Sequence, residues 1–414
     1  MRLQAQSGTK RKGKSVILLW LDGGPPHMDT YDPKPLAPSE YRGPWGALKT
    51  NAPGVTVSES LPLHAKHGDK MVLLRSVHHN NGDHFAAAHW MLTGRHGSSA
   101  SSKAQQYPSA GSYVSRVKGA NAPGMPAYVG LPSAESVALY PGYMGAAYLG
   151  TPYAPYDVNI KQRRMGYSRK EPFNKPEFLN SGTASVKRTG DRVDLLKQLD
   201  HINRAIDKSG QMAAMDKFNR AAVNMLLSPA ARAAFDIEKE DAKTRDRYGR
   251  NAWGHYTLMA RRLVEAGVSF ASVDIQSWDW HSKIKDGMGK QMPYLDKVVD
   301  ALLTDLKDRG LLDDVLVMVM GEFGRTPKMN GNAGRDHWGN VMSVMLAGGG
   351  LKTGQVIGAS NSKGEHPVER PLKPGDVLAT VYELLGIDPS QTFLNHSGRP
   401  IPILHEGKPI LEIL

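Results

Sequence analysis

Short apolar runs, each closed by glycine or by a polar cluster, divide the chain. They cover residues 15–21, 71–77, 268–275, 315–320 and 341–346. Continuous apolar runs of this length are typical of strands that are buried on both faces of a parallel sheet. In the second half of the chain they alternate with segments in which apolar residues recur every three or four positions, which predicts helices. The pattern therefore predicts an α/β fold, in which helices cover both faces of a mostly parallel sheet.

Helices are predicted where this spacing or a capping residue is present. The predicted ranges are 85–92, 191–208, 212–227, 229–236, 256–266, 291–309 and 377–385. Residues 98–190 are rich in Gly, Pro, Ser and Tyr and lack a long periodic segment, which is unusual inside a compact domain. We interpret them as an insertion, either a substrate-facing cap or a flexible surface segment. The expected organisation is a basic tail at residues 1–14 and a single domain at residues 15–414.

Four clusters of carboxylates and imidazoles follow the predicted strands. They are Asp22 with His27 and Asp29; Asp83 with His84; Asp279 with His281; and Glu322 with Asp336 and His337. Open α/β sheets place their ligand sites at the carboxyl ends of the strands, so these side chains are expected to converge there. Carboxylates and imidazoles without thiols suit divalent ions such as zinc, manganese or calcium. The clusters therefore predict a site for one or two such ions.

Each candidate also has a structural interpretation. An aspartate after a strand, such as Asp22, is as often a turn or helix cap as a ligand. Arg325 and Arg335 could bind an anionic ester bidentately, with His27 as a further substrate contact, or they could pair with Glu322 or Asp336 to hold the loop. The tryptophans beside these residues could be core side chains or could stack on a ring of the substrate. His78 and His79 are interpreted as ordinary loop residues.

Composition narrows the functional classes. Lys and Arg outnumber Asp and Glu by 52 to 40, but the chain lacks long basic blocks with interleaved aromatics, so nucleic-acid binding is disfavoured. A net charge of +12 suits phosphate esters, sulfate esters or acidic polymers better. The absence of cysteine excludes disulfides, thiolate metal sites and a cysteine nucleophile. No apolar stretch is long enough to span a membrane, and neither a Walker A motif nor a G-x-S-x-G motif is present.

Several segments of the sequence resemble a known family. They are LLWLDGGPPHMDTYDPKP, the Thr93-Gly94-Arg95 ending, SWDWH, GEFGRTP followed by GRDHW, and the late GRPI. Over nearly the whole chain they are similar to the family of domain of unknown function 1501, which is assigned to the alkaline phosphatase and sulfatase superfamily. The resemblance implies a doubly wound α/β fold with metal ligands at the strand ends. Many family members are exported, and the Arg2–Gln6 start resembles what remains after a leader is trimmed, so a periplasmic protein is expected.

The resemblance also assigns roles to residues. Asp22 and Glu322 match metal-binding carboxylates of the superfamily, and Asp279 with His281 resembles its second metal pair. His84 falls at the nucleophile position ahead of Thr93-Gly94-Arg95, where superfamily enzymes carry Ser, Thr or Cys. Its imidazole could therefore hold an ion that activates water, or could itself attack the substrate.

The expected function is metal-dependent hydrolysis of a phosphate or sulfate ester, on a small molecule or an anionic glycan. His84 and Arg325 are the expected catalytic residues. The predicted metal ligands are Asp22, His84, Asp279, His281, Glu322, Asp336 and His337. Two alternatives stay open: an inactive superfamily member that binds an anionic glycan, and a metallo-phosphomutase.

Overall fold

The computed structural model describes residues 13–134, 143–158, 167–168, 170, 176–180, 223–225 and 227–414. The predicted helix at 191–208 and nearly all of the one at 212–227 lie outside these residues, as does much of the predicted insertion. Among the described residues, no helix is both long enough and apolar enough to cross a lipid bilayer.

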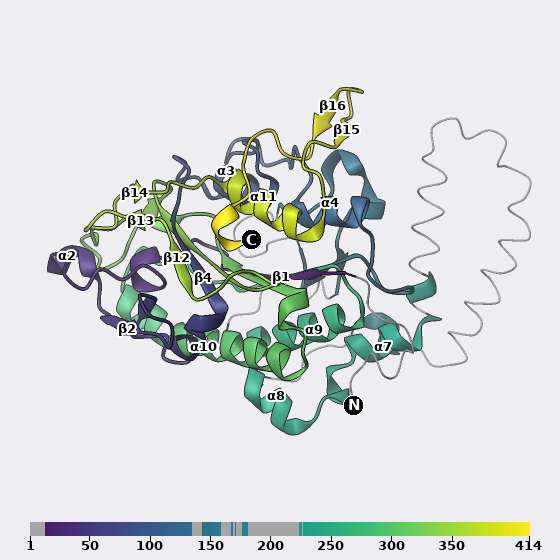
Figure 1. Cartoon of the computed structure of the whole chain (residues 1–414), viewed down its shortest axis with the longest axis horizontal. Coiled ribbons are helices and arrows are strands. Elements are labelled where there is room, and N and C mark those ends of the chain that lie inside the picture. Colours follow the sequence, from purple (N-terminus) through teal and green to yellow (C-terminus); the bar gives the residue numbers. More distant parts are fainter. Residues whose placement is uncertain are drawn as a thin grey trace, which may run out of the picture.

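An eight-stranded sheet forms the centre of the molecule, with the strand order β12-β4-β11-β8-β1-β7-β5-β6 (Figure 1). Its strands are β1 (Ser15–Trp20), β4 (Met71–Val77), β5 (Tyr128–Leu131), β6 (Tyr156–Asp157), β7 (Phe270–Asp274), β8 (Val315–Met320), β11 (Met342–Gly348) and β12 (Gln355–Ile357). Only β11 runs antiparallel to its neighbours, β4 and β8; the other described pairs are parallel. The expected mostly parallel α/β sheet is confirmed.

Helices cover both faces of this sheet. One face carries α9 (Ala252–Ala266) and α10 (Ile284–Asp308), and the other carries α3 (His84–Thr93), α4 (Ala110–Val117) and α11 (Pro374–Leu385) (Figure 1). Alternate residues of β1 enter the two cores: Ile17 and Leu19 face α9 and α10, whereas Val16 and Leu18 face the other helices. All six residues of β1 are buried, as the continuous apolar run predicts.

Smaller elements surround the sheet. The helices are α2 (Ser39–Arg42), α7 (Pro229–Phe235) and α8 (Ala242–Tyr248), and the two-stranded sheets pair β2 (Ala47–Lys49) with β3 (Thr56–Ser58), β9 (Gly324–Arg325) with β10 (His337–Trp338), β13 (Ala359–Ser360) with β14 (Pro367–Glu369), and β15 (Thr392–Leu394) with β16 (Pro400–Pro402).

Helices α9 and α10 begin at least four residues earlier than their sequence pattern predicts. Helix α9 begins at Ala252 because the Asn251 side chain accepts a hydrogen bond from Gly254 N (3.1 Å) and caps it. Helix α10 begins at Ile284, although Gly287 and Gly289 weaken the helical pattern before Gln291. Burial of its first turns against the core outweighs these unfavourable residues.

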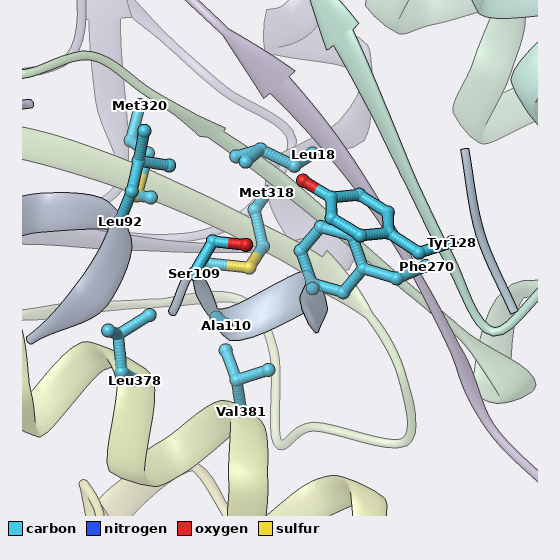
Figure 2. Close-up of a pocket in the computed structure, with 11 residues that line it drawn as sticks. Leu18, Leu92, Ser109, Ala110, Tyr128, Phe270, Met318, Met320, Leu378 and Val381 are labelled. Atoms are coloured by element: carbon cyan, nitrogen blue, oxygen red, sulfur yellow. The ribbon is translucent and has the colours of Figure 1, made fainter. Parts of the chain in front are cut away.

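A small cavity of about 10 Å³ lies in the core between the sheet and α11 (Figure 2). Leu18, Met318, Tyr128, Phe270 and Leu378 are among its lining residues. It has room for about one water molecule, and its lining is mostly apolar. None of the predicted site residues lines it, so it is a packing defect of the core rather than a substrate pocket.

Candidate functional site

The carboxyl ends of three neighbouring parallel strands define the site. In the sheet β1 lies between β7 and β8, with Trp20 level with both Asp274 and Met320. The segments that follow these three strands therefore leave the sheet side by side, and they carry Asp22, Asp279 and Glu322. His84, in the first turn of α3, and His337, in β10, lie beside these segments. The topology thus brings together residues that lie up to 315 positions apart in the chain, from Asp22 to His337.

Four side chains converge most closely. The Nε2 atoms of His281 and His337 lie 2.9 Å apart, and each faces Asp279 Oδ1, at 3.0 and 3.2 Å respectively. His84 Nε2 approaches the other oxygen, Asp279 Oδ2, at 3.6 Å. The nearest donor atoms of His84, Asp279 and His337 all lie within 4.8 Å of one another, which is a separation suited to a metal ion.

The second nitrogen of each imidazole contacts an acceptor. His281 Nδ1 lies 2.7 Å from Asp336 Oδ1, His337 Nδ1 lies 2.8 Å from the Gly82 carbonyl, and His84 Nδ1 lies 2.7 Å from Glu322 Oε1. Carboxylates and carbonyls only accept, so we assign the ring proton of each neutral histidine to Nδ1. The three Nε2 lone pairs then point toward the Asp279 carboxylate. This arrangement is stable only if a cation, either a proton or a metal ion, lies between them.

Glu322 and Asp336 lie one step further from the point of convergence. The Glu322 carboxylate accepts hydrogen bonds from Gly23 N (2.9 and 3.2 Å) as well as from His84, and it is fully buried. Asp336 accepts from His281 and from Asn330 Nδ2 (3.1 Å). Both carboxylates therefore orient histidines, the role that groups behind metal ligands usually have. That they ligate an ion directly stays a prediction.

Asp22 and Asp274 form a buried acidic pair beside Glu322. Burial raises the pKa of Asp274 well above its ordinary value, and the charges of Asp22 and Glu322 raise it further. Asp274 was not predicted from the sequence, because it is the last residue of its strand rather than part of the following loop. The available signal was a single aspartate inside an otherwise apolar run.

Arg325 holds Asp279 in place. Its Nε donates to Gly24 O (2.9 Å), one terminal nitrogen donates to Arg335 O (3.1 Å), and the other contacts Gly23 O and Asp279 Oδ1. Burial by itself would raise the pKa of Asp279, but its contacts with the His337 and His84 rings and the Arg325 charge lower it far below its ordinary range. Asp279 therefore stays ionised. Four of the five N–H donors of Arg325 already have protein partners and its side chain is 1% exposed, so its contact with a substrate anion, which stays a prediction, would have one N–H donor available.

Arg335 and His27 do not reach the point of convergence. Arg335 pairs with Asp29 (2.7 Å) and donates to the carbonyls of Thr326 (2.9 Å), Tyr41 (2.8 Å) and Pro327, so its guanidinium is saturated by the protein. The His27 side chain is buried, and its Nε2 donates to Gly364 O (2.8 Å). We had expected both to contact substrate. In the structure their side chains instead donate hydrogen bonds to carbonyl oxygens of neighbouring loops.

The buried His27 provides a test of this structural role. Burial lowers its pKa to about 4, against about 6.5 in an unfolded chain. As the pH falls below 6.5 the unfolded state binds the proton first, so stability is lost between pH 6.5 and 4. The His27→Gln variant keeps a donor for Gly364 O but cannot titrate. Between pH 7 and 4 its free energy of unfolding, measured in urea, is expected to fall by about 3 kcal/mol less than that of wild type. The exposed-site variant His366→Gln should keep the wild-type pH dependence; an equal loss in all three proteins would contradict the assignment.

His79 is more closely tied to the site than an ordinary loop residue. Its Nε2 lies 2.6 Å from the Glu322 carbonyl, and its ring stacks on Trp90 with centroids 5.7 Å apart. Burial lowers the pKa of His79, which favours the neutral ring. His79 thus connects the end of β4 to the segment that carries Glu322. Neither its spacing nor its neighbours in the sequence signalled this contact.

Fold and site together define an α/β protein with a cluster of imidazoles and carboxylates at the carboxyl edge of a mostly parallel sheet. The chain belongs to the family described as protein of unknown function (DUF1501), whose model matches residues 13–414. The expected family is thereby confirmed. No protein with a curated description is similar enough in sequence to be matched.

Solved structures with a similar arrangement of the chain include three enzymes. The PsFucS1 sulfatase from Pseudoalteromonas sp. has 13% identity and a TM-score of 0.43, over 93% of this chain and 69% of the sulfatase. The lipoteichoic acid synthase LtaP from Listeria monocytogenes has 12% identity and a TM-score of 0.40, over 99% and 81% of the two chains. The phosphonate monoester hydrolase SpPMH from Silicibacter pomeroyi has 10% identity and a TM-score of 0.36, over 97% and 76%. Similarity at this level carries no inference about the reaction.

Proposed function

We propose that this protein is a metal-dependent hydrolase of phosphate or sulfate esters, and that a single ion is held by His84, Asp279, His281 and His337. One observation carries the proposal. His281 Nε2, His337 Nε2 and Asp279 Oδ1 all lie within 3.2 Å of one another, while the Nδ1 atom of each ring contacts an acceptor. Such convergence is what a metal ligand set requires.

The donor set favours a borderline ion over a hard one. Three imidazole nitrogens and one carboxylate suit zinc, manganese or a similar transition ion, whereas calcium takes six to eight oxygen ligands. Two nitrogens bound tetrahedrally to zinc at about 2.0–2.1 Å lie roughly 3.3 Å apart. The 2.9 Å between His281 and His337 would therefore have to widen only slightly. An ion at this position would polarise an ester oxygen and lower the pKa of water.

The protein side chains supply orientation and access. The side chains of His84 and Asp279 are 7% and 23% exposed, whereas those of His281 and Asp336 are 45% and 54% exposed. The site therefore opens on the side of His281, and His84 lies at its floor. An ester would enter past His281 and place its reacting group above His84. Asp279, kept ionised by Arg325, would contribute a constant negative charge to the ion.

His84 has an unusual protonation state for a residue at this position. Burial lowers its pKa, but hydrogen bonds and charges of Asp279 and Glu322 outweigh burial and raise the pKa to about 9. In the absence of an ion the ring thus holds a proton at neutral pH, because Asp279 and Glu322 favour a positive charge at this position. The same two carboxylates would favour a metal ion, which would take the place of the proton between His84 and Asp279.

The decisive experiment combines elemental analysis with a panel of aryl phosphates and sulfates. Wild-type protein loaded with zinc or manganese is expected to hydrolyse at least one ester. His84→Ala should bind the ion at least ~10–100-fold more weakly, and excess ion should restore part of the turnover. The matched variant His405→Ala, at an exposed histidine, should behave as wild type.

Other outcomes would point to other chemistry. If His84 itself attacks the ester, turnover is lost in His84→Ala at every ion concentration, and wild type accumulates an acid-labile phospho-enzyme. An inactive glycan-binding protein would hydrolyse no ester but retain anionic oligosaccharides. The substrate panel would also distinguish phosphate esters from sulfate esters and identify the kind of molecule that carries the ester group. Fractionation of the native host would test the proposed location in the periplasm.

A further inference from the structure

Two loop segments are paired along the open side of the site. Residues 277–283 carry Asp279 and His281, and residues 330–336 carry Asp336. We call them the paired loops. Their backbones are joined at three points: Lys283 N to Asn332 O (3.0 Å), Ile284 N, the next residue, to Ala333 O (2.9 Å), and Arg335 N to Trp280 O (3.1 Å). The Asn330 side chain adds a bond to His281 O (3.0 Å).

The backbone of the paired loops is strained. Five described residues other than glycine have a positive φ, and three of them lie in these segments: Ser277 (81°), Lys283 (46°) and Ala333 (53°). Each such conformation is unfavourable for a residue with a side chain and persists only where the surrounding contacts enforce it. Most of the strain of this kind in the described chain is therefore concentrated around His281 and Asp336.

Gly334 allows the two loops to approach each other. A Cβ atom at this position would lie 2.1 Å from the His281 carbonyl carbon and 2.3 Å from its oxygen, closer than real Cβ atoms come. Glycine is thus required here for close approach rather than for its φ angle. A Cβ atom on Gly331, in the same loop, would have no neighbouring atom within 4 Å. The backbone of residue 334 consequently packs directly on the backbone of His281.

This contact matters because side-chain interactions alone hold His281 weakly. Its Nδ1 bond to Asp336 joins two side chains that are 45% and 54% exposed, and exposed ion pairs contribute little and are screened by salt. His84 and His337, in contrast, are 7% and 25% exposed and are held by Glu322 and by a backbone carbonyl. The close approach of Gly334 therefore restrains the backbone of His281 itself, together with the hydrogen bonds that join the paired loops.

We propose that Gly334 is a positioning residue for the ion site: its close approach fixes the backbone of His281 so that Nε2 faces His337 and Asp279. The inference rests on the proposed function, because it assumes that these atoms hold an ion. It adds that the affinity of the site is set partly by a residue that has no side chain and no contact with the ion.

The test compares the cobalt(II) affinity of wild type, Gly334→Ala and Gly331→Ala. Visible absorption and calorimetry measure the binding. Gly334→Ala is expected to bind cobalt ~10–100-fold more weakly, as loss of a supporting contact typically does, while Gly331→Ala keeps the wild-type affinity. Circular dichroism and thermal unfolding establish that each variant is folded. The second arm adds each glycine substitution to His281→Ala: if Gly334 acts through His281, Gly334→Ala causes no further loss of affinity there.

Two results would overturn the inference. Equal cobalt affinity in wild type and Gly334→Ala would leave the proposed function intact and remove only the role of Gly334. An undiminished effect of Gly334→Ala in the His281→Ala background would show a general distortion instead of positioning. Failure of wild type to bind cobalt at all is a different result, because it would refute the ion site and with it the proposed function.

Discussion

Asp279→Asn is expected to remove the bound ion and ester hydrolysis together. The carboxylate is the only charged donor among the four proposed ligands, and its Oδ1 lies within 3.2 Å of two imidazole nitrogens. The amide keeps the shape of the side chain but not its negative charge, and it leaves the buried Arg325 without its carboxylate. Loss of even a supporting group costs ~10–100-fold in metal affinity, so loss of this ligand should cost more than ~100-fold.

The measurement is elemental analysis after dialysis, with ester turnover on the same samples. Asp286→Asn is the matched control, since Asp286 lies exposed in the first turn of α10 in the segment that follows the paired loops. It should retain the ion content and turnover of wild type. Wild-type ion content in Asp279→Asn would contradict the ligand set and require a site elsewhere in the chain.

Arg335→Ala is expected to destabilise the fold by about 3–5 kcal/mol, because it removes one partner of a buried ion pair. Arg335 and Asp29 are each 1% exposed at the side chain, and the guanidinium also satisfies carbonyls of Tyr41 and Thr326. Burial raises the pKa of Asp29 even with Arg335 in place, so the orphaned carboxyl would take up a proton and limit the loss.

Urea unfolding would measure this effect. Arg370→Ala provides the comparison, because Arg370 pairs with Glu412 where both side chains are 41% exposed. That exposed pair should contribute less than ~1 kcal/mol. The double variant Arg335→Ala/Asp29→Ala should recover part of the lost stability. If Arg335→Ala were as stable as wild type but failed to bind an anionic ester, the substrate-binding role that we first expected would be restored.

The sequence was sufficient for five of the eight strands, namely β1, β4, β7, β8 and β11, because burial on both faces leaves a continuous apolar run. Residues 15–20 and 315–320 are continuous apolar runs, and they form β1 and β8 at the centre of the sheet. A doubly buried strand cannot accommodate polar side chains at most positions, so the run itself identifies it. The residues that follow such strands were correctly expected at the carboxyl edge, and six of them, including Asp279 and Glu322, lie in one connected set of contacts.

Sequence did not distinguish residues that face an ion from residues that support them. Arg325, Arg335 and His27 carry the same functional groups as substrate contacts, but tertiary contacts turn their donors toward buried carbonyls and carboxylates. The contact between His79 and Glu322 joins the ends of β4 and β8, which are separated by β11 in the sheet and by 238 positions in the chain, from Val77 to Val315. Such partners are chosen by three-dimensional proximity, which periodicity along one chain does not encode.

The sequence by itself thus determined the class of fold, the edge of the sheet at which polar groups gather, and the thiol-free chemistry of the donors. The tertiary structure decided which atoms meet there: His84, His281 and His337 turn their Nε2 atoms toward Asp279 because Glu322, Asp336 and the Gly82 carbonyl engage the opposite nitrogens. It also decided the role of Gly334, whose absent side chain has meaning only where another backbone approaches it. The physical reason is the same in each case: composition fixes which groups are available, whereas hydrogen-bond direction and close packing are properties of the folded arrangement.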